Sequence, residues 1–210
     1  KVGYTAIDID KRVAQQYPTK RPDGKVPYKI VLRESAMYND GGNFTDHDVH
    51  KVLKKKKIPC VGGEWFRCTV HDVKAAVIAV KNKTFNIENR TADFSMRPEQ
   101  EEAVNKTIEY FQSCEKEEHR YAIPKFLWNA KMRFGKTFAS YQLAKKMGLK
   151  KILILTFKPA VKAAWEEDLK THVDFEGWQF ISNYDESGLN SNRLYERANK
   201  NNPIVCFGSF

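Results

Sequence analysis

The sequence lacks long apolar runs. None of its hydrophobic stretches approaches the ~18–20 residues of a membrane-spanning helix, so no such helix is predicted and no membrane partner is expected. Cysteine is also scarce, and no C-x-x-C pair occurs among the four residues of this type: Cys60, Cys68, Cys114 and Cys206. This argues against a disulfide framework or a zinc knuckle and favours ordinary thiols in a reducing cytoplasm.

Start and stop signals are missing as well. Residues 1–5 resemble neither a signal peptide nor the region of a start methionine. Residues 204–210 have the composition of a β-strand and carry no terminal cap or tail. We therefore expect the chain to be a piece of a longer protein.

Positive charge exceeds negative charge, with 36 lysines and arginines, 26 aspartates and glutamates and a net charge of +10. Residues 1–93 hold 18 basic and 11 acidic residues (+7), and residues 94–210 hold 18 and 15 (+3). Basic clusters occur at Lys20-Arg21 and at Lys54-Lys55-Lys56-Lys57. A basic surface favours a polyanion such as nucleic acid. The alternative is a solvated helix end, where lysines interact with the helix dipole and need no partner.

Two blocks of different pattern are joined by residues 83–96, which are polar, lack periodicity and are predicted to be a linker. In the first block, residues 1–82, the sequence predicts strands at 1–5, 27–32 and 65–68 and helices at 8–16, 46–53 and 73–80. Thr45 or Asp46 can cap the second of these helices, and Thr69 or Asp72 can start the third. The first block is therefore expected to be a small α/β domain.

The second block, residues 97–210, alternates helices and strands. Helices are predicted at residues 97–113, 136–147, 160–171 and 192–199, and strands at 126–129, 152–156, 179–182 and 204–207. Pro98 suits the first turn of the leading helix, and Gly148 suits the end of the next one. The strands are almost entirely apolar, which is typical of a parallel sheet covered on both faces.

The octapeptide at residues 130–137, Ala-Lys-Met-Arg-Phe-Gly-Lys-Thr, lies between an apolar run and a helical run, as a phosphate-binding loop does. Gly135 permits a tight turn whose N–H groups point at a phosphate, beside the positive end of the next helix. Lys136 can reach the outer phosphates of ATP, with Arg133 in the same loop, and Thr137 can offer a hydroxyl to Mg²⁺. We predict an ATP and Mg²⁺ site; the alternative is a glycine turn with an exposed lysine.

This block resembles the first RecA-type lobe of superfamily 2 helicases and translocases, especially the motor subunits of type I and type III restriction enzymes. Residues 97–100 resemble the adenine-recognising Q motif, residues 130–137 motif I and residues 155–159 motif Ia. Ala130 replaces the first glycine of motif I, which this family often lacks. The resemblance implies that Gln100 hydrogen-bonds the adenine edge, because an amide can both donate and accept. Alternatively, Gln100 is a surface helix residue.

Nucleic-acid contacts are implied at two strand ends. Lys158 and Ser209 follow strands of the predicted parallel sheet, at the carboxyl ends where open α/β sheets bind ligands. In the resembled family these segments touch the nucleic-acid backbone; alternatively, Ser209 only caps a turn. The acidic motif II, the second lobe and the arginine finger do not occur in the sequence. Because hydrolysis needs those groups, we expect the 210 residues to bind nucleotide without useful turnover.

A second constellation lies in the first block. Its string Gly63-Glu64-Trp65-Phe66 resembles the marker of the phage-type branch of the GIY-YIG nuclease superfamily. The resemblance implies hydrolysis of a phosphodiester, which needs a divalent metal, a positive charge for the phosphate and a proton-transfer group. Asp46 could hold the metal, and Arg12 could clamp the phosphate with two hydrogen bonds. His50 or Tyr4 could assist proton transfer. The alternatives are an exposed helix arginine, a helix-capping aspartate and a packed histidine.

With the string Gly63-Glu64-Trp65-Phe66, these residues resemble the phage-type branch of the GIY-YIG nuclease superfamily, which a G-E-W-F string marks. Val2-Gly3 matches the end of the family's Y-I-G tripeptide, and Arg12 matches its helix arginine. Lys1 replaces the tyrosine of that tripeptide, and Asp46, four residues before His50, replaces a metal-binding glutamate. The resemblance implies a Mg²⁺-dependent endonuclease.

Together the blocks predict an α/β protein, in which a small GIY-YIG-like α/β domain (residues 1–82) precedes a partial RecA-like parallel-sheet P-loop domain (residues 97–210). We expect a restriction-type enzyme that cuts double-stranded DNA with Mg²⁺ and moves along it with ATP, in the cytoplasm. Two alternatives remain: a non-catalytic DNA-binding module on a motor, and a P-loop protein with no DNA role. DNA specificity, the direction of movement and the oligomeric state stay open.

Overall fold

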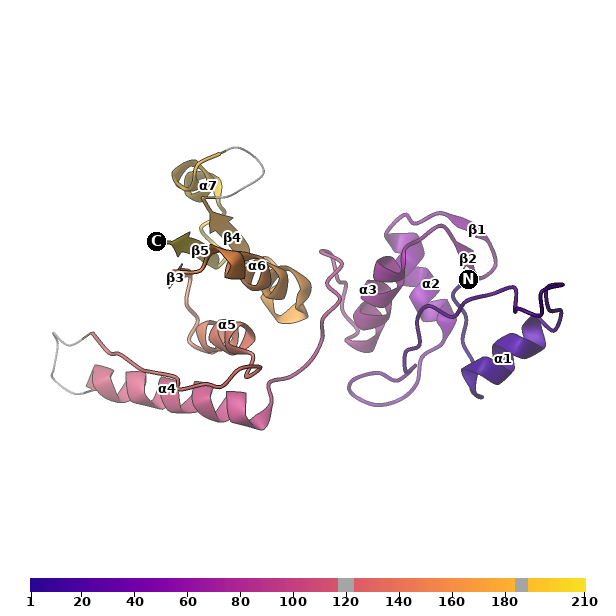
Figure 1. Cartoon of the computed structure of the whole chain (residues 1–210), viewed down its shortest axis with the longest axis horizontal. Helices are drawn as coiled ribbons and strands as arrows, with labels where there is room; N and C mark the ends of the chain where they lie inside the picture. The colour runs from indigo at the N-terminus through magenta and orange to yellow at the C-terminus, as the bar shows by residue number, and fades with distance from the viewer. Residues whose placement is uncertain (117–122, 184–188) are drawn as a thin grey trace. The chain divides into compact units, whose positions relative to one another are not determined.

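The computed structural model describes residues 1–116, 123–183 and 189–210. Contacts between residues divide the chain into two compact units, unit 1 (Lys1–Thr91) and unit 2 (Ala92–Phe210) (Figure 1). The division falls inside the segment 83–96 that the sequence predicts to be a linker. In the described ranges, no helix combines the length and the apolar character needed to cross a bilayer.

The helices of unit 1 begin at capping residues. α1 (Ile9–Gln16) follows Asp8, whose carboxylate accepts a hydrogen bond from the Lys11 N–H at 2.9 Å. α2 (Asp46–Lys55) and α3 (Val70–Lys81) each begin with a capping box, which satisfies two otherwise unpaired N–H groups. These three helices agree with the sequence-based prediction, because caps and apolar spacing act locally.

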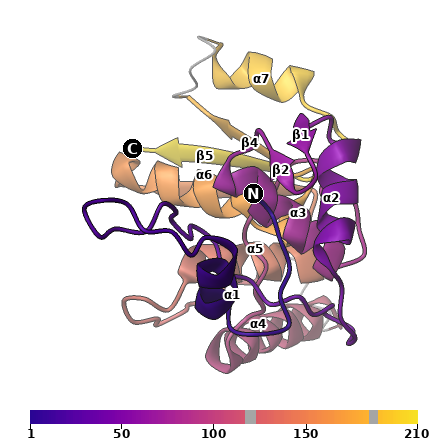
Figure 2. The same ribbon diagram turned by 90° about the vertical axis from the view of Figure 1, so that its right-hand side faces the viewer.

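α2 and α3 pack side by side and provide most of the core of unit 1 (Figures 1 and 2). Leu53 of α2 is fully buried, which stabilises the fold by ~1.5–3 kcal/mol. The strands β1 (Cys60–Gly62) and β2 (Trp65–Phe66) form an antiparallel hairpin. Phe66 closes the core from the hairpin side, so the hairpin is fixed against the two helices.

Two predicted strands of unit 1 are wrong. Residues 1–5 and 27–32 form no strand in the structure. Residues 1–5 meet the hairpin through a hydrogen bond from the Val2 N–H to the Glu64 carbonyl at 2.9 Å. A strand needs a ladder of such bonds from a neighbour, and this segment has no further rung in unit 1.

Unit 2 is a mixed α/β structure built on a three-stranded parallel sheet. Its elements in chain order are α4 (Pro98–Lys116), α5 (Lys136–Lys146), β3 (Lys151–Thr156), the 3-10 turn η1 (Pro159–Val161), α6 (Lys162–Thr171), the 3-10 turn η2 (Val173–Phe175), β4 (Gln179–Ser182), α7 (Ser191–Arg197) and β5 (Ile204–Ser209). The strand order is β3-β5-β4, with β5 in the centre (Figure 1). The predicted α/β class and parallel sheet are therefore confirmed.

The core of unit 2 joins α5 and α6 to the sheet. It contains the buried residues Phe138, Tyr141, Ile154, Leu169, Phe175, Val205 and Phe207. Tyr141 is fully buried, and its hydroxyl donates to the Trp165 carbonyl at 2.9 Å. Burial raises the pKa of Tyr141, so its hydroxyl stays protonated as a donor.

The predicted strand at residues 126–129 is also wrong. The segment forms no strand, and Leu127 is 88% exposed. Its Trp128 Nε1 donates to Thr107 Oγ1 of α4 at 2.8 Å, so the segment lies on a helix. β3 remains at the edge of the sheet among the described residues, because nothing there pairs with its free side. The RecA-like assignment, in which this strand leads into the loop, stays a prediction.

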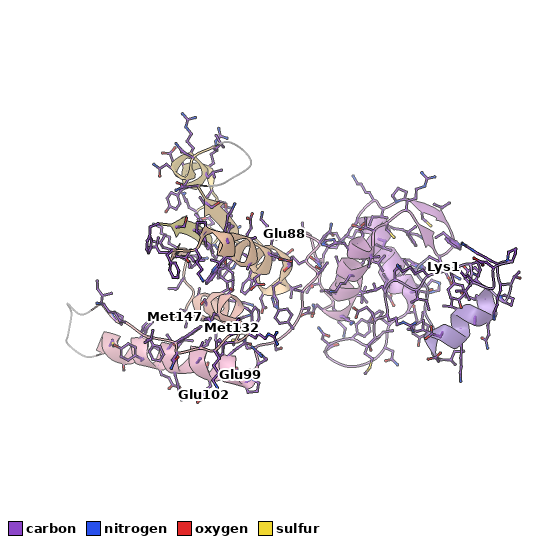
Figure 3. The ribbon with its side chains drawn as sticks, in the orientation of Figure 1. Lys1, Glu88, Glu99, Glu102, Met132 and Met147 are labelled. Carbon is purple, nitrogen blue, oxygen red and sulfur yellow. The ribbon has the colours of Figure 1, made fainter. Side chains whose placement is uncertain are left out.

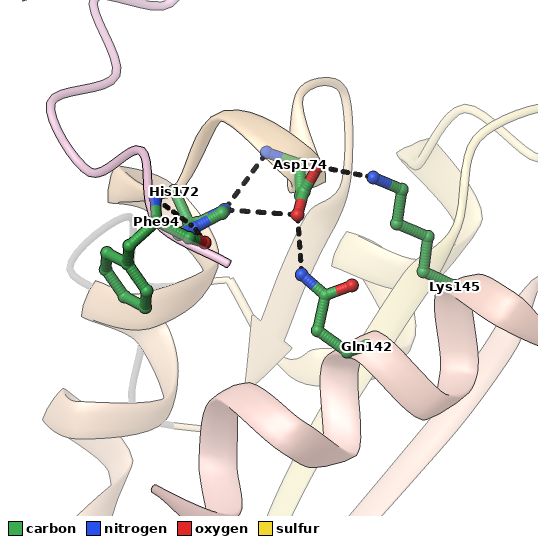
Figure 4. Close-up of polar contacts among 5 residues, drawn as sticks. All are labelled: Phe94, Gln142, Lys145, His172 and Asp174. Atoms are coloured by element: carbon green, nitrogen blue, oxygen red, sulfur yellow. Dashed lines mark hydrogen bonds and ion pairs between the residues drawn. The ribbon is translucent and has the colours of Figure 1, made fainter. Parts of the chain in front are cut away.

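A polar network ties residues 92–94 into unit 2 (Figure 4). Ala92 forms a parallel bridge with His172, and the His172 ring donates from Nε2 to the Phe94 carbonyl at 2.9 Å. His172 Nδ1 accepts from the Asp174 N–H at 3.1 Å. The Asp174 carboxylate in turn binds Gln142 and Lys145 of α5, each at 2.5 Å. The network therefore joins the start of unit 2 to the helix that follows the loop 130–137.

Candidate functional site

The loop 130–137 of unit 2 makes the tight turn expected at Gly135. Gly135 has a φ of +80° and is the N-cap of α5. The positive φ favours glycine, and a Cβ at this position would lie 2.5 Å from the Gln100 Nε2 atom and displace that amide from the loop. Arg133 also has a positive φ, of +64°, which is uncommon for a residue with a side chain.

Gln100 lies buried against this loop, with 4% of its surface exposed. Its Nε2 donates to the Phe134 carbonyl at 2.6 Å, and its Oε1 accepts from the Arg97 N–H at 2.9 Å. The Arg97 guanidinium donates to the carbonyls of Arg133, at 2.8 Å, and of Phe134. Gln100 and Arg97 therefore position the loop, and both ends of the Gln100 amide are engaged in doing so.

Lys136 and Thr137 lie in the first turn of α5. Lys136 Nζ donates to the carbonyls of Ala130 at 3.0 Å and Lys131 at 2.9 Å, so the ammonium group closes the loop on itself. Thr137 is half-buried, and no side chain caps this helix N-terminus in the structure as described. Uncapped N–H groups and an exposed lysine produce a positive field at the loop, which suits a phosphate.

The ends of β3 and β5 bring three polar residues together. Thr156 and Ser209 are register partners in the parallel pair. The Lys158 N–H donates to Thr156 Oγ1 at 3.1 Å, and the Lys158 side chain is exposed. The structure thus places Lys158 and Ser209 at the same carboxyl edge of the sheet, where ligands of open α/β folds bind.

In unit 1, a carboxylate lies beside residues 1–3, and it belongs to Glu64. Glu64 Oε2 is 3.0 Å from Lys1 Nζ, and a Cβ at Gly3 would lie 3.2 Å from the same oxygen. Figure 3 labels Lys1 at this end of unit 1. Glu64 occupies the turn between β1 and β2, and 40% of its side chain is exposed. The carboxylate is therefore accessible to a ligand.

His50 holds the same segment in place from α2. Its Nε2 lies 2.8 Å from the Val2 carbonyl oxygen. Because a carbonyl only accepts, the proton of the ring is on Nε2. The ring is 8% exposed and lies 4.9 Å from the Phe66 ring. His50 therefore fixes residues 1–3 next to Glu64, and its Nε2 is not free to take a proton.

The structure does not connect Asp46 to the other predicted site residues of unit 1. Asp46 begins α2, with 11% of its side chain exposed and Oδ1 3.3 Å from His47 Nδ1. Arg12 is exposed on α1, and Tyr4 is 39% exposed. No hydrogen bond or ion pair joins Asp46 to Tyr4, Arg12 or His50 within unit 1.

A metal site in this chain would rest on few protein ligands. Among the described residues, no three His, Cys, Asp or Glu side chains come close enough to hold an ion together. Mg²⁺ commonly keeps several waters and uses one or two carboxylates together with a phosphate. A single exposed carboxylate such as Glu64 fits that manner of binding.

Glu64 is not among the candidate metal ligands predicted from the sequence. The G-E-W-F string served as a family marker, and the carboxylate role went to Asp46 because of its spacing from His50. The useful signal was the Gly62-Gly63 pair before Glu64, which marks a hairpin turn. A residue in such a turn is exposed on a rigid support, as a metal ligand requires.

Comparisons with known proteins identify a domain family in the part of the chain that forms unit 1. Residues 1–81 match the family model of the T5orf172 domain. A protein of Mycoplasma pneumoniae, provisionally named as a type II restriction enzyme and methyltransferase, C-terminus, is 34% identical over 136 residues. The match covers 65% of this chain but only 16% of that relative. No solved structure gives a significant match.

The relative's match is longer than unit 1. Unit 1 has 91 residues, so at least 45 of the 136 matched residues (136 minus 91) belong to unit 2. The similarity to a restriction protein therefore includes both units. The predicted resemblance of the N-terminal part to GIY-YIG-like nucleases is confirmed at the level of a domain family, because residues 1–81 match the T5orf172 domain.

Proposed function

We propose that the chain is part of an ATP-dependent, restriction-type DNA enzyme of the cytoplasm. Unit 1 is its Mg²⁺-dependent endonuclease module, and unit 2 is the first RecA-like lobe of a superfamily 2 translocase. The observation that carries the nuclease half is the exposed Glu64 carboxylate beside Gly3 and Lys1 in a T5orf172-type domain. The relative named as a restriction enzyme supports double-stranded DNA as the substrate.

The residues of unit 1 divide the work of cleavage. Arg12 and Lys1 supply positive charge to the phosphodiester, Arg12 through parallel N–H groups. Glu64 would hold Mg²⁺, which when bound neutralises charge that develops on the phosphate. Tyr4, with its ring partly exposed, assists proton transfer. His50 acts as a positioning residue, because its Nε2–H is engaged with the Val2 carbonyl.

In unit 2 the loop 130–137 binds the phosphates of ATP. Lys136 leaves the carbonyls that it bridges and turns to the outer phosphates, with Arg133 in the same loop. Thr137 would offer its hydroxyl to Mg²⁺. Gln100 reads adenine by exchanging its contact with the Phe134 carbonyl for the base edge. Lys158 and Ser209, at the edge of the sheet, contact the DNA backbone.

Plasmid cleavage with Mg²⁺ or Mn²⁺ tests the nuclease half. We expect the protein to nick supercoiled plasmid and Glu64→Gln to reduce the rate by ~10²-fold or more, as removal of an essential group does. Asp46→Asn is the matched control, because it removes one carboxylate charge at the start of α2. Loss of cleavage in Asp46→Asn alone would assign the metal to Asp46. Intact plasmid with the wild-type protein and both metals would reject nuclease activity.

Two alternative functions predict different results. The 3.0 Å ion pair between Lys1 and Glu64 offsets the charge of the exposed carboxylate, and this favours a non-catalytic DNA-binding module. DNA binding that survives both Arg12→Ala and Glu64→Gln, without cleavage by the wild type, would support this module. A P-loop protein with no DNA role is the other candidate. A DNA affinity that falls steeply with salt concentration would count against it.

A further inference from the structure

Unit 1 has an open hollow of about 410 Å³ on the α2–α3 pair. Its lining combines apolar side chains with three lysines and includes no acidic residue; the side chains used in the argument are Val52, Val80, Lys51, Lys55, Lys83 and Phe85. Apolar groups beside three cations suit a ligand that combines an anion with an uncharged body. A sugar–phosphate backbone has this chemistry.

The rim lysines are held only weakly by other groups. Lys51 pairs with Asp48 at 3.1 Å and Lys83 with Asp40 at 2.7 Å, and both lysine side chains are more than half exposed. Exposed pairs of this kind contribute ~0–1 kcal/mol, so an arriving phosphate can replace the carboxylate. Lys55 has its Nζ 4.4 Å from the Phe85 ring centroid and no ion pair among the described residues.

Lys83 occupies a strained backbone position. It follows α3 with a φ of +53°, and the Thr84 N–H closes the helix end on the Ala79 carbonyl at 3.0 Å. Glycine is the usual residue at this position, and a lysine costs ~1 kcal/mol relative to it. The turn at this position places the cation of Lys83 at the hollow.

We propose that this hollow binds the phosphate backbone of the DNA on which unit 1 acts, as a contact separate from the Glu64 site. The proposal rests on the proposed function, in which DNA is the substrate. One helix serves both places, since α2 presents His50 to Val2 and presents Lys51 and Lys55 to the hollow. A helix with its side chains is about 10–12 Å across. One turn of B-DNA is about 34 Å long, so one duplex can reach both places.

DNA binding by the whole 210-residue chain, measured by fluorescence anisotropy on a short labelled duplex over a salt series, tests the hollow. Lys55→Gln and Lys83→Gly should each weaken binding ~3–10-fold at low salt and reduce the salt slope by about 1, the value for one lost phosphate contact. Lys83→Gly should at the same time raise the melting temperature, because it relieves the strained backbone. Weaker binding by a more stable protein cannot come from misfolding.

Lys57→Gly is the matched control. Lys57 follows α2 with a φ of +59°, in the same type of helix end, but it does not line the hollow. It should gain stability and keep its DNA affinity within ~2-fold, since it loses no phosphate contact.

The remaining outcomes separate this proposal from the proposed function. An equal loss of DNA affinity in all three variants, or no loss in Lys55→Gln and Lys83→Gly, would contradict phosphate binding at the hollow. DNA would remain the proposed substrate. No DNA binding by the wild-type chain at low salt would overturn both. Cleavage lost in Glu64→Gln with binding unchanged would support a DNA contact outside the catalytic site.

Discussion

Gly135 shows how a single residue connects the phosphate loop to the rest of unit 2. Its φ of +80° turns the loop into α5, and its missing Cβ leaves room for the Gln100 amide. Gln100 in turn fixes the Phe134 carbonyl, and Arg97 fixes it as well. The sequence predicts the turn from Gly135 itself, but it assigns Gln100 only to adenine. Gln100 and Gly135 are 35 positions apart in the chain, so their contact can be seen only in the fold.

Gly135→Ala should therefore destabilise unit 2 by more than backbone strain alone. Gly148→Ala is the control, because Gly148 has a φ of +66° and nothing within 4 Å of an added Cβ. We expect a loss of ~1 kcal/mol for Gly148→Ala and ~2–4 kcal/mol for Gly135→Ala, measured by urea denaturation. Adding Gln100→Ala should recover part of the Gly135→Ala loss. Equal losses in the two single variants would contradict a close contact with Gln100.

At the scale of elements, helices follow from local sequence, whereas strands depend on distant partners. The capping residues of α1 and α3 directly precede each helix, and their side chains accept hydrogen bonds from N–H groups only three residues later. The segments 1–5, 27–32 and 126–129 have strand-like composition, yet no ladder forms on them. The same limit explains why the sequence does not place Glu64 beside Lys1, since the two residues are far apart in the chain. Composition marks a segment that can be a strand, and only the fold supplies its neighbour.

Asp174 links η2 to α5, so its charge should matter in a pH-dependent way. Burial alone would raise its pKa, but hydrogen bonds from Lys145 and Gln142 outweigh burial and hold the pKa below the usual aspartate range. Its stabilising effect is therefore complete above about pH 3.9, the unfolded value, and is lost as the pH falls through the lower folded pKa. Asp174→Asn should lower the unfolding free energy of unit 2 by ~1 kcal/mol at neutral pH and less in acid.

Asp168 of α6 provides a control of opposite sign for that experiment. Burial, with a smaller effect of Glu167, raises the pKa of Asp168. A raised pKa stabilises the fold below the unfolded pKa and loses that effect as the pH rises through the folded value. Asp168→Asn should therefore be neutral or stabilising at neutral pH. A loss equal to that of Asp174→Asn in urea denaturation would show that neither charge is responsible.

At the scale of the whole molecule, each unit has its own core and its own candidate site. The core of unit 1 gathers around Leu53, and that of unit 2 includes Leu169; both side chains are fully buried. The basic excess is greater in residues 1–93, where the proposed DNA contacts Arg12, Lys55 and Lys83 lie. Two cores of this kind predict two separate unfolding transitions, each sensitive to the ligands that bind its unit.

Calorimetry on the 210-residue chain tests this division. Leu53→Ala and Leu169→Ala should each cost ~2–5 kcal/mol and lower only the transition of their own unit. Duplex DNA at about 100 times its dissociation constant should raise the unfolding free energy of unit 1 by ~2.7 kcal/mol, and ATP with Mg²⁺ at the same excess should raise that of unit 2 by a similar amount. DNA should also stabilise unit 2, because Lys158 and Ser209 are proposed to contact its backbone. A single transition that both variants move would mean that the units unfold together. DNA acting only on the Leu169 transition would place DNA binding in unit 2, because a ligand stabilises only the part of the protein whose folding creates its site.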